Sequence, residues 1–219
     1  TVEIFASKWP VPTMKTYILR QGFDFMWIAG GYGIRPYGFP AFQTHLQIPI
    51  CVLTPWRNLM YNKSNLQKGG QKMNAIYRIN GKVIETERLI LRAFRESDLA
   101  DFYEYASVKG VGEMAGWKHH KSIGESAEIL DMFINEDKTF AICLKESGKV
   151  IGSLGIEKYG LEEKLTEFDT YRGREIGYVL SKEYWGRGLM PEAVKAVIDY
   201  LFEDLDFDFL LCGYYNFNA

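Results

Sequence analysis

Residues 83–106 carry two different spacings of hydrophobic side chains. The run VIETERLILRAF is rich in residues that favour strands, and it predicts a β-strand. The next run, RESDLADFYEYA, predicts an amphipathic helix that Ser97 or Glu96 can cap. The apolar positions of this helix follow helical spacing: Leu99, Phe102, Tyr103 and Ala106.

A second helix and a hairpin follow in the same pattern. HKSIGESAEILDMFINED predicts a helix capped near Ser122. Its expected apolar face consists of Ile123, Ala127, Leu130 and Ile134. TFAICLKESGKVIGSLGIEKYG predicts two antiparallel strands joined at Glu146-Ser147-Gly148, where the glycine supplies the unusual φ of a tight turn.

The last third of the chain predicts one further strand–helix–strand unit. An acidic and polar loop over about residues 160–172 leads into the strand GREIGYVLS, a Gly-rich turn, a helix and the final strand FDFLLCGYY. The complete order is β-α-α-β-β-β-α-β. This order predicts an α/β fold of the α+β type, in which helices flank a mostly antiparallel central sheet with one crossover connection.

The segment SKEYWGRGLMPEAVKAVIDYLF places Gly186, Arg187 and Gly188 directly before a helix. Pro191 suits the first helical position, which makes Met190 the expected N-cap, although its side chain has no oxygen to accept from the free N–H groups. Free N–H groups, a helix dipole and flexible glycines favour an anion such as pyrophosphate. A tight strand-to-helix connection with a solvated arginine explains the same residues, so the turn by itself leaves both interpretations open.

Two common phosphate-binding motifs do not fit this turn. A P-loop requires Lys-Ser or Lys-Thr after its last glycine, and neither follows Gly188. The dinucleotide fingerprint requires a third glycine, which GRGLMP lacks.

The composition is that of an ordinary globular protein, with 47% hydrophobic and 25% charged residues in a chain of 219 and a net charge of −2. No apolar run approaches the ~18 residues of a membrane span, and the first residues lack the pattern of a secretory signal. The cysteines Cys51, Cys143 and Cys212 lie far apart, and the three histidines have no metal-binding spacing. We therefore expect reduced thiols, no metal site and a cytoplasmic location.

Charge divides the chain at about residue 72. Residues 1–72 hold eight basic and two acidic residues, a net charge of +6, whereas residues 73–219 hold 18 basic and 26 acidic residues, a net charge of −8. The first segment also contains twelve aromatic residues without a sustained period of strand or helix. A basic arm of this kind could bind nucleic acid, but no binding motif accompanies the charge, so this interpretation is not favoured.

We interpret residues 1–72 as no recognisable domain and as a candidate for upstream sequence translated in frame. Lys68-Gly69-Gly70 can be encoded by AAAGGAGG, a bacterial ribosome-binding sequence, and Met73 follows at a suitable distance. On this hypothesis the natural protein starts at Met73, and residues 73–219 form one domain.

Three runs together resemble one known family: ETERLILRAFRESDLADFYEYA, AGWKHHKSIGESAEIL with its Trp-x-x-His lead-in, and REIGYVLSKEYWGRGLMPEAV. The family is the GNAT superfamily of acyl-coenzyme A N-acyltransferases, and the likeness is greatest to the branch that contains the RimJ and RimL ribosomal-protein acetyltransferases. In its acetyl-CoA motif, R/Q-x-x-G-x-G/A, Trp185 to Met190 fill the six positions, and Met190 departs from the usual glycine or alanine. The resemblance covers about residues 83–219, and Asn218 resembles the first residue of the family's N-x-x-S element.

The resemblance implies acetyl-CoA as co-substrate and gives the matched residues their roles. The backbone near Val179 would pair with the pantetheine arm, the amides of residues 186–190 would hold the pyrophosphate, and Asn218 would contact the pantetheine or adenine. The implied cofactor-binding residues are Val179, Leu180, Trp185, Gly186, Arg187, Gly188, Leu189, Met190 and Asn218. The family's thiolate-protonating Tyr or Ser, last helix and last two strands would lie beyond Ala219, which indicates a C-terminally truncated fragment.

The reaction that the resemblance implies is direct attack of a neutral amine on the acetyl thioester. The amine must first lose a proton to a base, and the tetrahedral oxyanion needs an N–H donor, expected near Val179. Alternation along the strand puts Glu175 and Gly177 on the same face as Val179, so Glu175 is the candidate catalytic base.

Other roles stay open for the titratable residues. A surface carboxylate, or one paired with Arg172 or Arg174, is an equal alternative for Glu175. His119 and His120 could line the amine pocket, but they are better explained as loop histidines.

Three functional hypotheses follow. The first is an acetyl-CoA-dependent N-acetyltransferase that acts on a protein N-terminus or a small amine. The second is a non-catalytic acyl-CoA-binding module, and the third is an acetyltransferase with an N-terminal nucleic-acid-binding arm. The sequence does not identify the acceptor amine, and it leaves a homodimer open.

Overall fold

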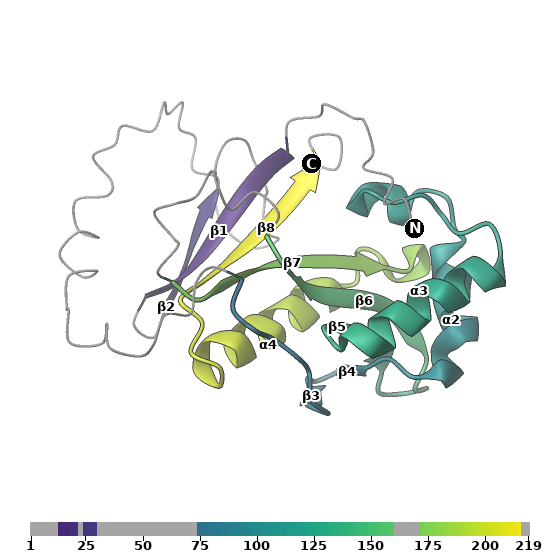
Figure 1. Ribbon diagram of the computed structural model, residues 1–219, viewed down its shortest axis with the longest axis horizontal. Helices are drawn as coiled ribbons and strands as arrows, with labels where there is room; N and C mark the ends of the chain where they lie inside the picture. The colour runs from purple at the N-terminus through teal and green to yellow at the C-terminus, as the bar shows by residue number, and fades with distance from the viewer. Residues whose placement is uncertain (1–12, 22–23, 30–73, 160–170, 216–219) are drawn as a thin grey trace.

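The computed structural model describes residues 13–21, 24–29, 74–159 and 171–215 (Figure 1), with the backbone alone for 13–21, 24–29 and 213–215. The strands are β1 (Thr13–Gln21), β2 (Asp24–Ala29), β3 (Ile84–Glu85), β4 (Leu89–Ala93), β5 (Thr139–Leu144), β6 (Val150–Glu157), β7 (Gly173–Leu180) and β8 (Phe209–Tyr215). The α-helices are α2 (Leu99–Ala106), α3 (Ile123–Glu136) and α4 (Leu189–Glu203). None of the helices in the described ranges combines the length and apolarity that a membrane span needs.

The described strands form one sheet in the order β2-β1-β8-β7-β6-β5-β4-β3. Neighbouring strands are antiparallel except β7 and β8, which are parallel and joined through α4. The run at residues 83–94, predicted as one strand, instead forms the two short antiparallel strands β3 and β4, because the chain turns between them, where the Thr86 N–H donates to the Leu89 carbonyl at 3.0 Å. The rest of the predicted order, the mostly antiparallel sheet and the single crossover are confirmed. The expected polar loop at 160–172 lies largely outside the described residues.

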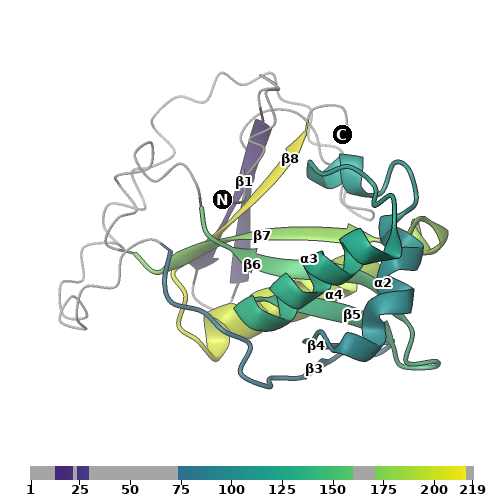
Figure 2. The same ribbon diagram turned by 45° about the vertical axis from the view of Figure 1, so that its right-hand side comes forward.

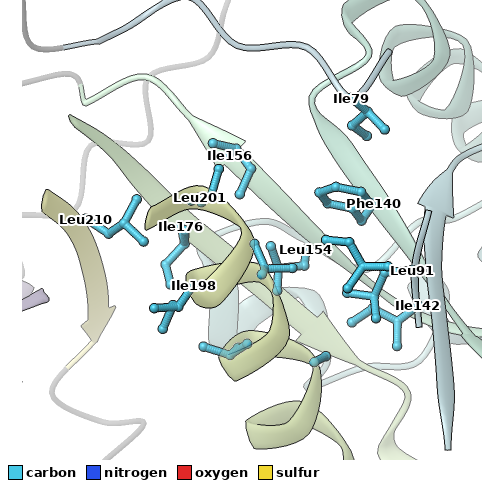
Figure 3. Packing of buried hydrophobic residues seen from close by; sticks show 14 of the residues in the cluster. Ile79, Leu91, Phe140, Ile142, Leu154, Ile156, Ile176, Ile198, Leu201 and Leu210 are labelled. Carbon is cyan, nitrogen blue, oxygen red and sulfur yellow. The ribbon is translucent and has the colours of Figure 1, made fainter. Parts of the chain in front are cut away.

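Successive side chains along a strand point to opposite faces of the sheet, and each face packs into its own hydrophobic core. Phe140 and Ile142 of β5 pack with α4, whereas Ala141 and Cys143 pack with α2 and α3. Figure 3 shows the first core, where Ile198 and Leu201 of α4 point toward sheet side chains. The sheet side chains labelled there are Leu91, Phe140, Ile142, Leu154, Ile156, Ile176 and Leu210. The helices thus cover both faces of the sheet.

Helix α2 begins differently from the prediction. Neither Ser97 nor Glu96 caps it, because both lie in a short 3-10 helix over Glu96–Asp98. The Asp98 carboxylate instead accepts hydrogen bonds from the Arg95 backbone N–H (2.9 Å) and from both terminal nitrogens of Arg92 (2.7 and 2.8 Å). Asp98 is buried, so its bidentate ion pair with Arg92 holds the connection between β4 and α2 in place.

The buried faces of the two helices also differ in part from the prediction. Tyr105 rather than Tyr103 is buried in α2, because it lies on the same helix face as the buried Phe102 and Ala106. Ser122 caps α3 as predicted and accepts a hydrogen bond from the Glu125 N–H. Of the predicted face, Leu130 is buried and Ile134 packs against the same core, whereas Ile123 is 51% exposed. The β5–β6 hairpin is confirmed, with Gly148 at a φ of +73°.

The strands β1 and β2 continue the sheet beyond β8 (Figures 1 and 2). Strand β1 pairs antiparallel with β8 from Thr13↔Tyr215 to Leu19↔Phe209, and β2 pairs with β1. The hypothesis that residues 1–72 are translated upstream sequence stays a proposal, and β1 offers a direct way to test it.

Removing residues 1–72, so that the chain starts at Met73, should leave the thermal midpoint unchanged if this proposal is correct. Pairing on β8 that contributes to stability would instead lower the midpoint by ~2–4 °C for each kcal/mol lost in a chain of this size. Thermal unfolding of the full and shortened chains, together with limited proteolysis of the full chain, separates the two cases. Protease resistance within residues 1–72 would contradict the proposal.

Candidate functional site

Strands β7 and β8 pair only at their beginnings. Their parallel ladder runs from Gly173↔Phe209 to Ile176↔Cys212, yet β7 continues to Leu180 and β8 to Tyr215. Figures 1 and 2 show β8 diverging from β7 in both views. We call this opening the β7–β8 split. It exposes the backbone edge of β7 beyond Ile176 to whatever enters between the strands.

The ladder with β6 decides which backbone groups of β7 face the split. The Ser181 N–H donates to the Ile151 carbonyl at 2.7 Å, and Ser153 pairs with Val179 in the same register. Hydrogen-bonded pairs alternate in an antiparallel ladder, so the Val179 N–H and C=O also face β6. The backbone N–H and C=O groups that face the split therefore belong to Tyr178 and Leu180 rather than to Val179.

Trp185 closes part of this edge. Its indole N–H donates to the Leu180 carbonyl at 2.8 Å, so of the two Leu180 backbone groups only the N–H remains directed at the split. This contact also fixes the start of the segment 185–188, here called the glycine turn. The side chain of Trp185 is 44% exposed and lies in the pocket wall.

The glycine turn places two residues in the left-handed region. Gly186 and Gly188 both have a φ of +73°, and a side chain at either position would be strained. Helix α4 begins at Leu189 with Gly188 as its N-cap, two residues earlier than the predicted start at Pro191 with Met190 as N-cap. The reason is that the Gly188 carbonyl already accepts from the Glu192 N–H at 3.3 Å, which closes the first turn.

The glycine turn also presents unused donors. Within the described part of the chain, no hydrogen bond joins the N–H groups of residues 186–190 to a protein acceptor. They sit at the positive end of α4, and a Cβ added at Gly186 would meet nothing within 4 Å. N–H groups at a helix N-terminus beside open space suit an anion, and the predicted pyrophosphate site stays a prediction.

A pocket of about 290 Å³ joins the glycine turn to the β7–β8 split. Its walls contain most of the implied cofactor-binding residues. The lining residues are Val111, Met114, Tyr178, Val179, Leu180, Tyr184, Trp185, Gly186, Gly188, Leu189, Met190 and Pro191. Arg187 is exposed and stacks over the Tyr184 ring, with 5.2 Å between its Cζ and the ring centroid. Asn218 lies outside the described residues.

Tyr178 extends the pocket toward β8. It is 41% exposed and lines the pocket. Burial raises the pKa of Tyr178 above its usual value. Burial also raises the pKa of Cys212 to about 11. Both groups are therefore neutral at physiological pH.

A loop packed over the split supplies the other wall. The 3-10 helix η4 (Gly112–Ala115) contacts β7 and β8, and it contributes Met114 to the pocket. Gly112 leaves no room for a larger side chain in this loop, because an added Cβ would clash with the Trp117 ring. Trp117 in turn packs on His120, so this tryptophan has a packing role.

The two histidines have different partners. His119 Nδ1 lies 2.7 Å from the Glu113 carboxylate, which also accepts from the Gly110 N–H at 2.7 Å. His120 is buried, with its Nδ1 2.7 Å from the Ser126 hydroxyl, and burial lowers its pKa. The interpretation of His120 as a structural histidine therefore fits its surroundings.

Glu175 lies on the paired side of the split. It is half-buried, opposite Leu211 of β8 and Glu157 of β6 in the ladder, and it does not line the pocket. Alternation along β7 does hold: Val179 packs with α2 and α3, whereas Ile176 and Leu180 pack with α4. The catalytic role of Glu175 stays a prediction.

Sequence reasoning missed three residues beneath the glycine turn. Thr86, Arg88 and Glu192 form a hydrogen-bonded cluster that links the start of β4 to the first turn of α4. Their separation in the chain leaves no local signal, although ETER lies within one of the runs that carried the family resemblance. Among the residues that the structure describes, no group of three His, Cys, Asp or Glu side chains is arranged to hold a metal ion.

Comparison with known proteins adds independent information. The sequence model of the acetyltransferase (GNAT) domain family matches residues 88–219. An uncharacterized N-acetyltransferase of Bacillus licheniformis, p20, is 29% identical over 131 residues, which cover 57% of this chain and 68% of p20. The family match contains the glycine turn and every residue of the pocket wall.

Two solved structures are also similar to the chain. A GNAT-family acetyltransferase from Bacillus anthracis is 23% identical with a TM-score of 0.49, over 57% of this chain and 69% of that one. RimL, described as a ribosomal L7/L12 alpha-N-protein acetyltransferase in complex with coenzyme A, is 18% identical with a TM-score of 0.46, over 57% of this chain and 71% of that one.

The Glu113–His119 pair predicts a specific response to acid. The hydrogen bond from His119 is the main cause that lowers the pKa of Glu113 from 4.5 to about 2. Because the folded-state pKa lies below the unfolded one, the stabilisation is complete above about pH 4.5 and is lost as the pH falls toward 2. Glu113→Gln should therefore show a shallower decline in thermal midpoint over this range than the wild type.

The control for this measurement is Glu146→Gln, which changes an exposed carboxylate in the β5–β6 turn. It should follow the wild-type profile. A Glu113→Gln profile that also follows the wild type would show that the pair does not stabilise the loop.

Proposed function

Because the chain belongs to the acetyltransferase (GNAT) domain family, we propose that it moves an acetyl group from acetyl-CoA to an amine by direct attack. The observation that carries this proposal is the single pocket that joins the glycine turn to the β7–β8 split. One end of the pocket offers N–H groups for a pyrophosphate, and the other offers a strand edge for an amide-containing arm.

The binding mode follows from these two ends. The N–H groups of residues 186–190 would hold the pyrophosphate, with the cation of Arg187 nearby. The Tyr178 carbonyl and the Leu180 N–H would pair with the amides of the pantetheine arm as it runs along β7. Val179 and Met114 would line the apolar passage toward the thioester.

The proposed reaction requires an N–H donor for the oxyanion and a base that takes the proton from the amine. An N–H of β7 that faces the split, such as that of Tyr178, suits the oxyanion that forms when the amine attacks the thioester. Glu175 is the proposed base, and because it lies on the paired side of the split, the proton would reach it through water. The proposed acceptor is a protein N-terminus or a small amine that enters beside η4.

A second candidate is a module that binds acyl-CoA without turnover. The position of Glu175 outside the pocket wall favours it, because the site then contains binding groups without a general base in contact. Release of CoA in the presence of a broad set of amines and N-terminal peptides separates the two. Tight binding of acetyl-CoA without any release would support the non-catalytic module.

Gly186→Glu should weaken acetyl-CoA binding by roughly ten-fold or more, equivalent to ~1.4 kcal/mol. The variant places a carboxylate among the N–H groups expected to hold the pyrophosphate. The matched control is Gly148→Glu, because Gly148 has the same φ of +73° and likewise has nothing within 4 Å of an added Cβ. Both variants should lose about 1–2 kcal/mol of folding stability through left-handed backbone strain.

Isothermal calorimetry with acetyl-CoA distinguishes the two variants. Only Gly186→Glu should lose affinity, since Gly148 lies in the β5–β6 turn and does not line the pocket. Equal affinities in both variants would mean that the glycine turn does not bind the pyrophosphate.

Glu175→Gln should lower the rate at pH 7 by about 100-fold or more while acetyl-CoA still binds. The rate should recover partly at high pH, where the amine loses its proton unaided. Glu157→Gln serves as the control, because Glu157 lies directly across the β6–β7 ladder and pairs with Lys138 at 2.7 Å. A Glu175→Gln enzyme as fast as the wild type at pH 7 would leave Glu175 as a structural carboxylate.

A further inference from the structure

Glu192 stands in a position that conflicts with anion binding. It lies in the first turn of α4, directly after the N–H groups proposed to hold a pyrophosphate. A carboxylate there stabilises the helix through its dipole, but the same charge repels a phosphate. A working anion site at this turn therefore needs some means of cancelling the charge of Glu192.

Arg88, in the turn directly before β4, supplies the opposite charge. Its Nε donates to Glu192 Oε2 at 2.7 Å, and one terminal nitrogen contacts the same oxygen at 2.6 Å. The other oxygen, Oε1, accepts from the Arg88 backbone N–H at 2.9 Å and from the Thr86 hydroxyl at 2.5 Å. Burial alone would raise the pKa of Glu192, but these hydrogen bonds outweigh it and the pKa lies below its usual value.

The same guanidinium holds the glycine turn directly. The Arg88 Nη1 donates to the Arg187 carbonyl at 2.9 Å. The Arg88 Nη2, which contacts Glu192, would lie 3.6 Å from a Cβ added at Gly188. A trans peptide directs its N–H opposite to its C=O. With the Arg187 carbonyl turned toward Arg88, the Gly188 N–H points away from Arg88.

We propose that Arg88 is a positioning residue for acetyl-CoA, which neutralises Glu192 and turns the Arg187–Gly188 peptide so that its N–H faces the pyrophosphate. The inference rests on the proposed function of the glycine turn. It deepens that function by adding a charge-compensating residue from the β3–β4 turn, 104 positions before Glu192 in the chain. Arg88 contacts the turn and not the reacting atoms, so its effect should appear in binding of the pyrophosphate-containing donor.

A double-mutant cycle tests this assignment. Arg88→Met keeps the side-chain length but leaves the Glu192 charge uncompensated, and it should weaken acetyl-CoA binding about ten-fold. Glu192→Gln leaves the Arg88 cation beside the turn, and it should hold acetyl-CoA at least as tightly as the wild type. The double variant should recover most of the affinity that Arg88→Met loses, because neither charge then remains.

The choice of acyl donor separates positioning from general damage to the fold. Acetyl-pantetheine lacks the pyrophosphate, so its KM should be the same in the wild type and all three variants. Lys82→Met provides a control: this change breaks an exposed ion pair with Asp204 (2.9 Å) at the far end of α4. It should leave the affinity for acetyl-CoA unchanged.

The outcomes are distinct. A wild-type protein that does not bind acetyl-CoA would overturn the proposed function and this inference with it. A wild type that binds, with Arg88→Met equal to it, would overturn the role of Arg88 alone. Equal losses of affinity in both single variants and the double variant, accompanied by lower thermal midpoints and weaker use of acetyl-pantetheine, would show that the pair only stabilises the fold.

Discussion

The site depends on one constraint of β-sheet geometry. When two neighbouring parallel strands diverge, the backbone N–H and C=O groups beyond that point lose their hydrogen-bond partners in the other strand. Strands β7 and β8 pair through Ile176 and Cys212 and then separate. Past that point the edge of β7 carries donors and acceptors without a partner in β8, and an unsatisfied backbone edge is costly unless water or a ligand covers it. The crossover through α4 then brings the helix N-terminus to the mouth of the same opening.

Charge compensation around α4 follows from this arrangement. A helix that begins at a left-handed glycine has no side-chain cap, so its first N–H groups stay available. Glu192 partly complements the dipole from within the helix, and Arg88, directly before β4, balances Glu192. The proposed anion site at the start of α4 thus draws on residues that lie far apart in the chain.

Local patterns in the sequence predicted the elements but not their rotation or their long-range contacts. The strand GREIGYVLS, the β5–β6 hairpin and the Ser122 cap follow from period and turn chemistry alone. The burial of Tyr105 instead of Tyr103 depends on which face of α2 packs on the rest of the protein, a tertiary contact that helical spacing alone leaves open. Likewise, the direction of the Tyr178 N–H depends on the register with β6, which no local pattern encodes.

Cys212 illustrates a hazard that an acyl thioester creates for its own protein. A thiol one side chain away from the pocket wall is a competing nucleophile, and attack by its thiolate would move the acyl group onto the enzyme. With a pKa of about 11, the thiolate fraction of Cys212 at pH 7 is on the order of one in ten thousand. Under the proposed function, a thiol that stays protonated would not take up the acyl group, which would leave the acetyl group for the amine.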